Sequence, residues 1–265
     1  MREGWAPIKL IFLLFLVLPI MFLLGLALPA LGFGLAAASI GFAIFNAVDK
    51  KLKVNINIRD GAAVKKGDIV LTVEGSAQSI LLAERLVLNC MQRMSGIATY
   101  TDHLSSLISG TSAKLLDTRK TTPGMRALEK YAVRMGGGTN HRMSLSDAAL
   151  IKDNHIAAAG GVVAAFSLVR EKYPSTDIEI EVDNLQQLRD VLPLNPGLVL
   201  LDNMSPAQCA EAVALVAGAT KLEASGGITI ENARAYAEAG VDYIAVGALT
   251  HSAPNFDIGL DMRVE

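Results

Sequence analysis

Cationic side chains gather in one stretch of the sequence, from Leu115 to His155. Seven Arg and Lys residues lie between Arg119 and Lys152, against two acidic residues, in a chain whose formal net charge is −2. The cations that follow an apolar run or a glycine turn are Arg119, Lys120, His141, Arg142 and Lys152. Guanidinium groups bind carboxylate or phosphate through two parallel hydrogen bonds, so this set suits a small polyanionic substrate. The alternative is a solvated basic face, and the stretch alone does not decide between the two.

Later segments of the chain offer complementary groups. Glu181, Asp183 and Asp202 are carboxylates that could hold a hydrated Mg²⁺ or the hydroxyls of a sugar. Two glycine turns, Ser225-Gly226-Gly227 and Val246-Gly247-Ala248, have the backbone pattern that binds phosphate. His251 follows the second turn and is either a phosphate donor or a capping residue. A sugar phosphate, a metal ion and a second anion therefore fit together in one site.

The elements that must position these groups alternate regularly after Ser109. Six short apolar runs predict strands at Ala113–Leu116, Ala148–Ile151, Ile178–Val182, Leu198–Leu201, Lys221–Ala224 and Tyr243–Val246. Helical patterns lie between most of them, at Ala157–Lys172, Leu185–Leu192, Pro206–Val216 and Ile230–Ala239. This alternation predicts parallel βαβ units closed as a barrel. In such barrels the ligand site lies at the carboxyl ends of the strands, where every run here is followed by polar or glycine residues. Together, the six strand ends predict one site.

The preceding segment predicts a smaller α/β layer. A helical pattern ends near Asp49, and the alternation of Val54–Ile58 and Ile69–Val73 predicts two strands separated by glycine turns. The turn pattern is similar to that of biotinyl and lipoyl domains, but the hairpin has no lysine to modify, which favours a structural β-layer. Ser79–Leu107 predicts a long helix, and Arg85 beside its apolar face reads on its own as a snorkelling surface residue.

The first 38 residues are strongly apolar and carry no residue suited to chemistry. No charged residue occurs from Leu10 to Val48, and the apolar run has the length of a membrane-spanning helix. A membrane segment, an element buried in a dimer interface and a misplaced gene start all fit this composition. Cys90 and Cys209 lie far apart outside metal-binding motifs, so buried free thiols are expected. The modest net charge gives no support to nucleic-acid binding.

Long motifs in this chain resemble the quinolinate phosphoribosyltransferases, the nicotinate-nucleotide pyrophosphorylases of NAD synthesis. In order they are LLDTRKTTPGMR, GGGTNHRMSLSDAALIKDNH, IEIEVDNLQQL, LLDNMSP, LEASGGI and VGALTHSAPNFDIGLDM, and the match runs from about Ser39 to Met262. The resemblance implies an α/β fold, with a small open α/β layer over residues 39–108 and an incomplete, TIM-like α/β barrel over residues 109–265. Residues 1–38 depart from the family, whose members begin with a polar helical segment.

The resemblance also implies a reaction and roles for particular residues. Ribose 5-phosphate would pass from phosphoribosyl pyrophosphate (PRPP) to the ring nitrogen of quinolinate, giving nicotinate mononucleotide, pyrophosphate and CO₂, with Mg²⁺ as the cofactor. The residues implied to bind quinolinate are Arg85, Arg119, His141, Arg142 and Lys152. Those implied to bind PRPP are Thr118, Lys120, Glu181, Asp202, Ser225, Gly226, Gly227, Val246, Gly247, Ala248 and His251, with Lys152 also facing the pyrophosphate. Glu181 and Asp202 would hold the metal, directly or through water. Arg85 matches an arginine that reaches the neighbouring subunit's site, which implies a homodimer.

Such a reaction needs positioning and charge stabilisation more than covalent help. The electrons left by CO₂ stay at the ring carbon beside the nitrogen, and the ring, cationic once its nitrogen is ribosylated, is their sink. No acid–base dyad is therefore required, and the sequence shows none at a recognisable spacing.

Three rival functions remain open at this point. Two share the fold: nicotinate phosphoribosyltransferase, and a pyrophosphorylase-like homologue associated with molybdenum transport genes. The third is a membrane-tethered binding protein with an inactive enzyme core. The abundance of cations favours the two-carboxylate substrate, and the intact basic and acidic sets argue against an inactive core. Because PRPP is cytoplasmic, we expect a cytoplasmic catalytic part, with membrane contact through residues 8–38 as an option.

Overall fold

The computed structural model describes residues 38–263, which form two compact units. The first unit contains the described residues up to Asp102, then Thr121–Gly137 and the described residues from Leu249; the second contains His103–Lys120 and Gly138–Ala248. The apolar segment before Ala38 lies outside the described residues, and its role stays a prediction. Within residues 38–263, no helix is both long enough and apolar enough to cross a membrane.

The first unit contains the small α/β layer that the alternating pattern predicted. Helix α2 (Ala38–Val48) lies against a two-stranded antiparallel sheet of β1 (Lys53–Ile56) and β2 (Leu71–Glu74). The long helix α3 (Ala77–Leu107) follows, as the sequence predicted. Helices α2 and α3 approach closely at Gly41, where a Cβ atom would lie 2.8 Å from the sulfur of Met91. A side chain at Gly41 would therefore require the Met91 thioether to shift.

Helix α4 (Arg126–Met135) also belongs to the first unit, and the sequence analysis did not predict it. Its Glu129 is fully buried and accepts hydrogen bonds from Arg93 Nε (3.2 Å) and Nη2 (3.1 Å). Thr122 donates to the same carboxylate through its backbone N–H (3.0 Å) and its hydroxyl (2.8 Å). These donors offset the cost of burying the charge, so an acidic residue fits inside this unit.

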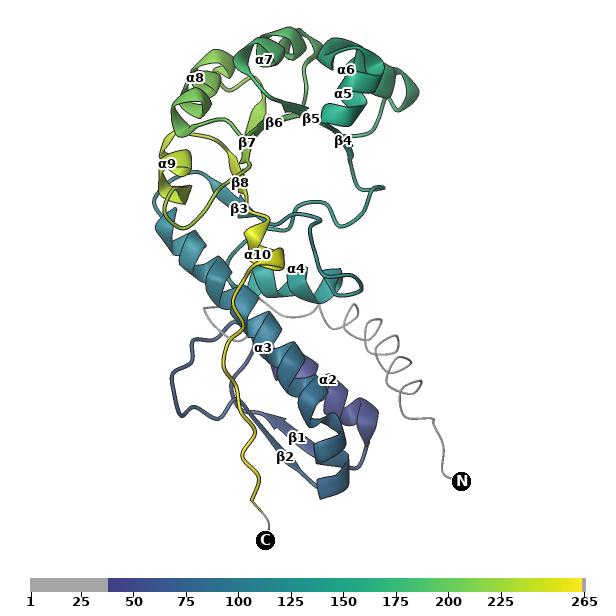
Figure 1. Ribbon diagram of the computed structural model, residues 1–265, viewed down its shortest axis with the longest axis vertical. Coiled ribbons are helices and arrows are strands. Elements are labelled where there is room, and N and C mark those ends of the chain that lie inside the picture. Colours follow the sequence, from purple (N-terminus) through teal and green to yellow (C-terminus); the bar gives the residue numbers. More distant parts are fainter. Residues whose placement is uncertain (1–37, 264–265) are drawn as a thin grey trace. The chain divides into compact units, whose positions relative to one another are not determined.

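The second unit contains a six-stranded parallel sheet that curves into an incomplete barrel (Figure 1). Its strands are β3 (Lys114–Leu116), β4 (Ala149–Ile151), β5 (Ile178–Val182), β6 (Leu198–Asp202), β7 (Lys221–Ser225) and β8 (Tyr243–Ala245), in the spatial order β3-β8-β7-β6-β5-β4. The strands β3 and β4 end this order, which leaves the barrel open between them. All six predicted strands are present, and the incomplete α/β barrel that the resemblance implied is confirmed.

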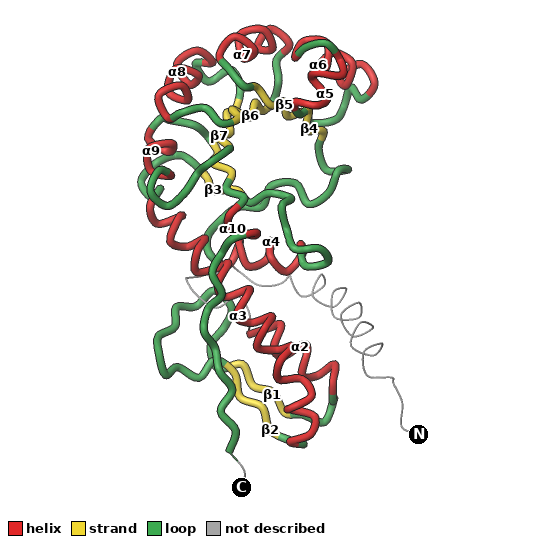
Figure 2. The backbone as a smooth tube through the Cα atoms, viewed as in Figure 1, coloured by secondary structure: helices red, strands yellow, loops and turns green. Residues whose placement is uncertain are grey.

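Helices lie outside the arc of strands (Figure 2). They are α5 (Asp153–Ala159), α6 (Val162–Lys172), α7 (Leu185–Val191) with the 3₁₀ turn Leu192–Leu194, α8 (Pro206–Val216) and α9 (Ala233–Glu238), and α10 (Ala248–His251) follows β8. The single helix predicted over Ala157–Lys172 was wrong, because the structure has two helices there. Gly160 and Gly161 adopt positive φ angles of 86° and 139°, which end α5 before α6 begins.

The two faces of the central strands differ in polarity, and this difference positions the site. Alternate residues such as Ile180, Val199 and Leu201 are fully buried in the apolar core. Residues between them, including Glu179 and Glu181, therefore point to the opposite, inner face of the barrel. The register places Glu181 of β5 beside Leu200 of β6. The strand pairing therefore fixes the height at which this acidic side chain enters the barrel.

Candidate active site

Lys152 and Glu181 form an ion pair at the carboxyl ends of two neighbouring strands. Lys152 follows β4 directly, and its Nζ lies 2.9 Å from Oε2 of Glu181 on β5. The other oxygen of Glu181 accepts a hydrogen bond of 3.3 Å from the backbone N–H of Asp153, the first residue of α5. The Glu181 side chain is 6% exposed and that of Lys152 is 48% exposed. The pair therefore joins a buried carboxylate to a cation that reaches solvent.

Glu181 also belongs to a group of three carboxylates. Ligand oxygens of Glu181, Asp183 and Asp202 all lie within 4.8 Å of one another. Asp202 ends β6, and its Oδ2 accepts a 2.7 Å hydrogen bond from the Asn203 amide. Burial raises the pKa of the Asp202 carboxyl, and the negative charge of Glu181 adds to the rise. This like-charge repulsion is the condition that a bound divalent cation would relieve.

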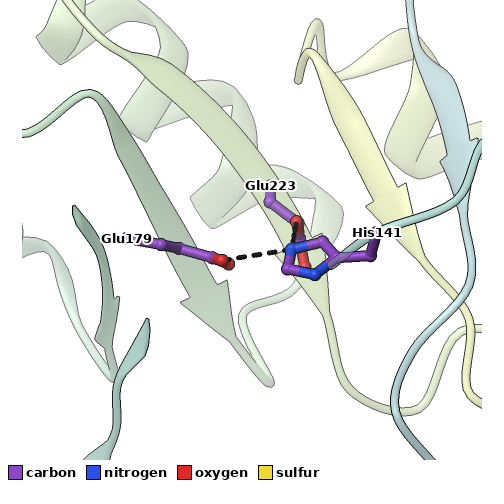
Figure 3. A group of neighbouring side chains, drawn as sticks. All are labelled: His141, Glu179 and Glu223. Carbon is purple, nitrogen blue, oxygen red and sulfur yellow. Dashed lines mark ion pairs between the residues drawn. The ribbon is translucent and has the colours of Figure 1, made fainter. Parts of the chain in front are cut away.

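His141 lies between two buried glutamates (Figure 3). Its Nε2 is 3.1 Å from Oε2 of Glu179 on β5 and 3.3 Å from Oε2 of Glu223 on β7. The Glu223 contact has the distance of an ion pair without the angle of a hydrogen bond. Burial alone would lower the pKa of His141, but contacts with the two carboxylates outweigh it and raise the pKa to about 10. His141 is therefore an imidazolium at neutral pH.

Asp117 fixes the backbone that carries His141. It follows β3, is fully buried, and accepts hydrogen bonds from the backbone N–H of His141 (2.9 Å) and from the side chain of Asn140 (2.6 Å). The Thr139 N–H donates to the Leu115 carbonyl at 2.8 Å. The segment after the triple glycine is thus held along the end of β3, which brings two parts of the basic stretch together.

Arg142 and Arg119 are close enough to influence each other's charge. Burial lowers the pKa of Arg142, and the positive charge of Arg119 lowers it further, while Glu179 opposes the shift. An Arg142 Nη1 atom donates to the Ala148 carbonyl at 3.3 Å. Asp147 accepts the backbone N–H groups that follow Arg142, including that of Met143 at 2.7 Å. Three of the predicted cations therefore lie near one another and near Glu179 of β5: Arg119, His141 and Arg142.

The two glycine turns lie side by side because β7 and β8 are neighbours, with Ser225 paired with Ala245. Gly226 has φ of 97° and Gly227 has φ of 61°. A Cβ atom at Gly226 would collide with the side chain of Asn203, whereas nothing lies near such an atom at Gly227. Asn203 donates its backbone N–H to the Ser225 carbonyl at 2.8 Å. Close approach of β6 to the turn therefore requires glycine at position 226.

The remaining predicted residues have less specific surroundings. The Thr118 hydroxyl accepts the backbone N–H of Lys120 at 3.1 Å, and the side chain of Lys120 is exposed. Val246 is buried and donates its N–H to the Leu116 carbonyl at 3.0 Å. Arg85 and His251 belong to the first unit. Arg85 is 83% exposed and pairs with Glu84 at 3.3 Å; Nδ1 of His251 lies 2.6 Å from the Ser252 hydroxyl.

Comparison with known proteins decides the family. Two family models, described as the N-terminal and C-terminal domains of quinolinate phosphoribosyl transferase, match residues 34–95 and 97–261. The chain belongs to the quinolinate phosphoribosyl transferase family.

Relatives across bacteria agree with this assignment. The chain is 52% identical over 213 residues to the carboxylating nicotinate-nucleotide pyrophosphorylase of Mycobacterium leprae, which covers 79% of this chain and 75% of that protein. It is 41% identical to a probable enzyme of the same name from Bacillus subtilis, covering 83% of this chain and 76% of the relative. The solved structure of nicotinate-nucleotide pyrophosphorylase from Ehrlichia chaffeensis superposes with a TM-score of 0.83 at 41% identity, covering 86% of this chain and 83% of that one. The resemblance found in the sequence is confirmed.

The sequence analysis of this quinolinate phosphoribosyl transferase family member missed two residues of the site. Glu179 and Glu223 were read as parts of strand-like runs, although each places a carboxylate among buried apolar residues. A glutamate in a strand that is otherwise buried was the available signal, because such a charge needs a partner. His141, the partner, lies too far away in the sequence to be paired with either glutamate by pattern alone.

Proposed function

We propose that this chain transfers ribose 5-phosphate from PRPP to the ring nitrogen of quinolinate with loss of CO₂, producing nicotinate mononucleotide and pyrophosphate. The observation that carries the proposal is the arrangement of charged groups at the carboxyl ends of the strands in the second unit. Arg142 lies near Arg119, and His141 pairs with Glu179 on β5. On the same strand, Glu181 pairs with Lys152 and lies within 4.8 Å of Asp202. The glycine turns follow β7 and β8, which are neighbouring strands of the same sheet. Family membership and the names of the relatives support the same reaction.

The cations account for the choice of a dicarboxylate. Arg119, His141 and Arg142 carry three positive charges, of which Glu179 and Glu223 already compensate that of His141, so the two arginines suit a ring with two adjacent carboxylates. Nicotinate has one carboxylate and would leave more of this charge uncompensated. Lys152 is assigned to both the quinolinate and the pyrophosphate sides, and its ammonium group pairs with Glu181.

The carboxylates and glycine turns account for PRPP. We assign the ribose hydroxyls to Glu181 and Asp202, with Thr118 and Lys120 on the pyrophosphate side. The 5-phosphate is assigned to the glycine turns of the second unit, at Ser225, Gly226, Gly227, Gly247 and Ala248. Val246 was also predicted, but its backbone N–H already donates to the Leu116 carbonyl at 3.0 Å. His251 belongs to the first unit, and its role stays a prediction. Backbone N–H groups exposed at glycine turns suit the three oxygens of a phosphate.

Mg²⁺ is the proposed cofactor, and the residues fit it. Glu181, Asp183 and Asp202 supply carboxylate oxygens within 4.8 Å of one another, which are the hard ligands that Mg²⁺ prefers. Burial raises the pKa of the Asp202 carboxyl, and the negative charges of Glu181 and Asp183 raise it further, which supports a bound cation here. When bound, Mg²⁺ would neutralise charge on the pyrophosphate as it leaves.

The protein's own part in the chemistry is to hold and orient both substrates. As the bond from the ribose to pyrophosphate breaks, positive charge develops on the sugar, and the nearby carboxylates stabilise it. The pyridine nitrogen then forms the new bond to the ribose carbon. The ring becomes cationic, so the electron pair left by CO₂ stays on the ring carbon beside the nitrogen until a proton replaces it.

We also propose a homodimer in which Arg85 reaches the quinolinate site of the neighbouring subunit. The large exposure of its side chain and the exposed Leu82 nearby support an interface on this part of α3. The catalytic part is assigned to the cytoplasm, where PRPP is made, and membrane contact through residues 8–38 stays part of the proposal.

The test is a substrate comparison with the purified full-length chain. Quinolinate with PRPP and Mg²⁺ should give nicotinate mononucleotide, and nicotinate should be a poor substrate under the same conditions. Arg142→Ala should abolish turnover, whereas Arg189→Ala, at an exposed position on α7, should not. Consumption of nicotinate in preference to quinolinate would overturn the proposal in favour of a nicotinate phosphoribosyltransferase.

A further inference from the structure

Glu179 and Glu223 have no role in the transfer reaction as derived above, yet they are among the most buried charged residues in the described part of the chain. They are 3% and 2% exposed, and they stand on β5 and β7, on either side of the strand β6. Both point at one ring nitrogen of His141 (Figure 3). One oxygen of each glutamate, Oε1 of Glu179 and Oε2 of Glu223, makes no hydrogen bond in the structure. Burying two carboxylates with so few hydrogen bonds costs folding free energy, so we expect a functional reason for them.

The surrounding charges indicate what that purpose is. The groups that face the His141 ring are Glu179 from β5 and Glu223 from β7, and Asp117 holds its backbone from the end of β3. Arg142 follows His141, and the charges of both glutamates act on it, against the repulsion from Arg119. Lys152 acts on Glu223 from the end of β4. Without the glutamates, three cations would meet in a partly desolvated space, and His141 would lose its proton most readily.

We propose that Glu179 and Glu223 are positioning residues that hold His141 as an imidazolium and aim its charge at the quinolinate carboxylates. This proposal rests on the proposed function for the identity of the anion, but not for the state of His141. Two carboxylates stand within 3.3 Å of the same ring nitrogen, so when either one is neutral the other still faces the imidazolium. The pair keeps this cation present at alkaline pH, where an ordinary histidine would be neutral.

The state of His141 can be read directly by nuclear magnetic resonance of the imidazole nitrogens. The chain has four histidines, and His141→Gln identifies the signal. In the unaltered protein, His141 should remain protonated from about pH 6 to pH 9, whereas exposed histidines titrate near 6.5. In Glu179→Gln and Glu223→Gln, the midpoint should fall by roughly two to three pH units. Glu238→Gln, which removes an exposed partner of Arg234 on α9, is the matched control and should leave it unchanged.

The kinetic test separates a charge role from a merely structural one. Glutamine keeps the shape of the side chain, so loss of charge is the main change. At about pH 8.5 each variant should raise KM for quinolinate roughly ten- to a hundredfold, with much less change in KM for PRPP. At about pH 6, where His141 becomes charged without help, quinolinate binding should recover most of this loss. A folding defect would lower activity at both pH values and for both substrates.

Three results would overturn the proposal. The first is a His141 signal in the unaltered protein that titrates near the ordinary value, which needs no variant and no turnover to observe. The second is an unchanged His141 midpoint in folded Glu179→Gln and Glu223→Gln. The third is a purified protein that retains a metal ion bound to His141, Glu179 and Glu223, whose ligand atoms lie within 4.8 Å of one another. Failure to turn over quinolinate, with His141 still charged, would instead count against the proposed function.

Discussion

The ammonium group of Lys152 and the carboxylate of Glu181 form an ion pair at the carboxyl ends of β4 and β5, with 2.9 Å between Nζ and Oε2. The chain holds a second pair of the same kind at the opposite end of the sheet. Lys221, the first residue of β7, lies 2.6 Å from Asp242. The two pairs lie at opposite ends of the strands, and Lys221 serves as the control at the non-catalytic end, although Asp242 is 30% exposed where Glu181 is 6% exposed.

Lys152→Met should lower kcat/KM by roughly a hundredfold, because it removes a cation assigned to both substrates. Stability should fall as well, because the buried Glu181 carboxylate loses its cation. Lys221→Met should leave kcat/KM near the unaltered value. Steady-state kinetics and thermal unfolding of both variants make the comparison, and equal activity losses would contradict the assignment of Lys152.

Arg119→Ala should weaken quinolinate binding more than PRPP binding. The side chain is assigned to the quinolinate carboxylates, and the loss of a charged hydrogen-bonding partner typically costs roughly 1.5–3 kcal/mol, or about ten- to a hundredfold in KM. The measurement is KM for each substrate with the other at saturation. A loss of the same size for both substrates would show that Arg119 does not discriminate between them.

Asp202→Asn should lower activity and raise stability at neutral pH. The carboxyl pKa is raised from 3.8 by burial and by Glu181, so ionising Asp202 costs the folded state free energy. The cost is absent below the ordinary pKa, grows as pH rises, and is complete above the raised value. The variant should therefore gain roughly 1–3 °C in Tm at neutral pH and almost nothing at about pH 3.

Mg²⁺ provides a second readout of the same carboxylates. Adding Mg²⁺ should stabilise the unaltered protein and have a smaller effect on Asp202→Asn, because one ligand is missing. Asp190→Asn, on the exposed side of α7, is the control. An equal Mg²⁺ response in both variants would place the metal elsewhere.

Gly226→Ala and Gly227→Ala should differ although the residues are neighbours. Both have positive φ, but only at Gly226 would a Cβ atom collide with Asn203. Gly227→Ala should cost about 1 kcal/mol of stability, the ordinary penalty of the left-handed region. Gly226→Ala should cost roughly 3 kcal/mol or more and impair PRPP binding, because the turn must move. Urea unfolding measures the difference, and similar values for the two variants would refute the close approach.

Much of the fold was predictable because most strands and helices have a recognisable local sequence pattern. Each strand of the barrel is a short apolar run, and the residue after each run had to lie at one edge of a parallel sheet. The strand-end rule therefore groups Lys152, Glu181 and Asp202, and the structure brings them together. The motifs that matched the family supplied the reaction, which no pattern of periodicity contains.

The parts that were not predicted depend on contacts between distant residues. Helix α4 was not recognised within the basic stretch, and its Glu129 is buried only because Arg93 and Thr122 compensate its charge. The roles of Glu179 and Glu223 depend on their contacts with His141, which lies in the loop after the triple glycine. Such pairings are three-dimensional, so a sequence pattern can indicate that a partner is needed without naming it.

The most direct test of the central claim is the stoichiometry of a single reaction with full-length protein, PRPP, Mg²⁺ and quinolinate labelled with ¹⁴C in the carboxylate beside the ring nitrogen. For each molecule of nicotinate mononucleotide formed, one labelled CO₂ and one pyrophosphate should be released, and Arg142→Ala should suppress all three together. Pyrophosphate release without labelled CO₂, or no reaction at all while nicotinate is ribosylated, would contradict the account.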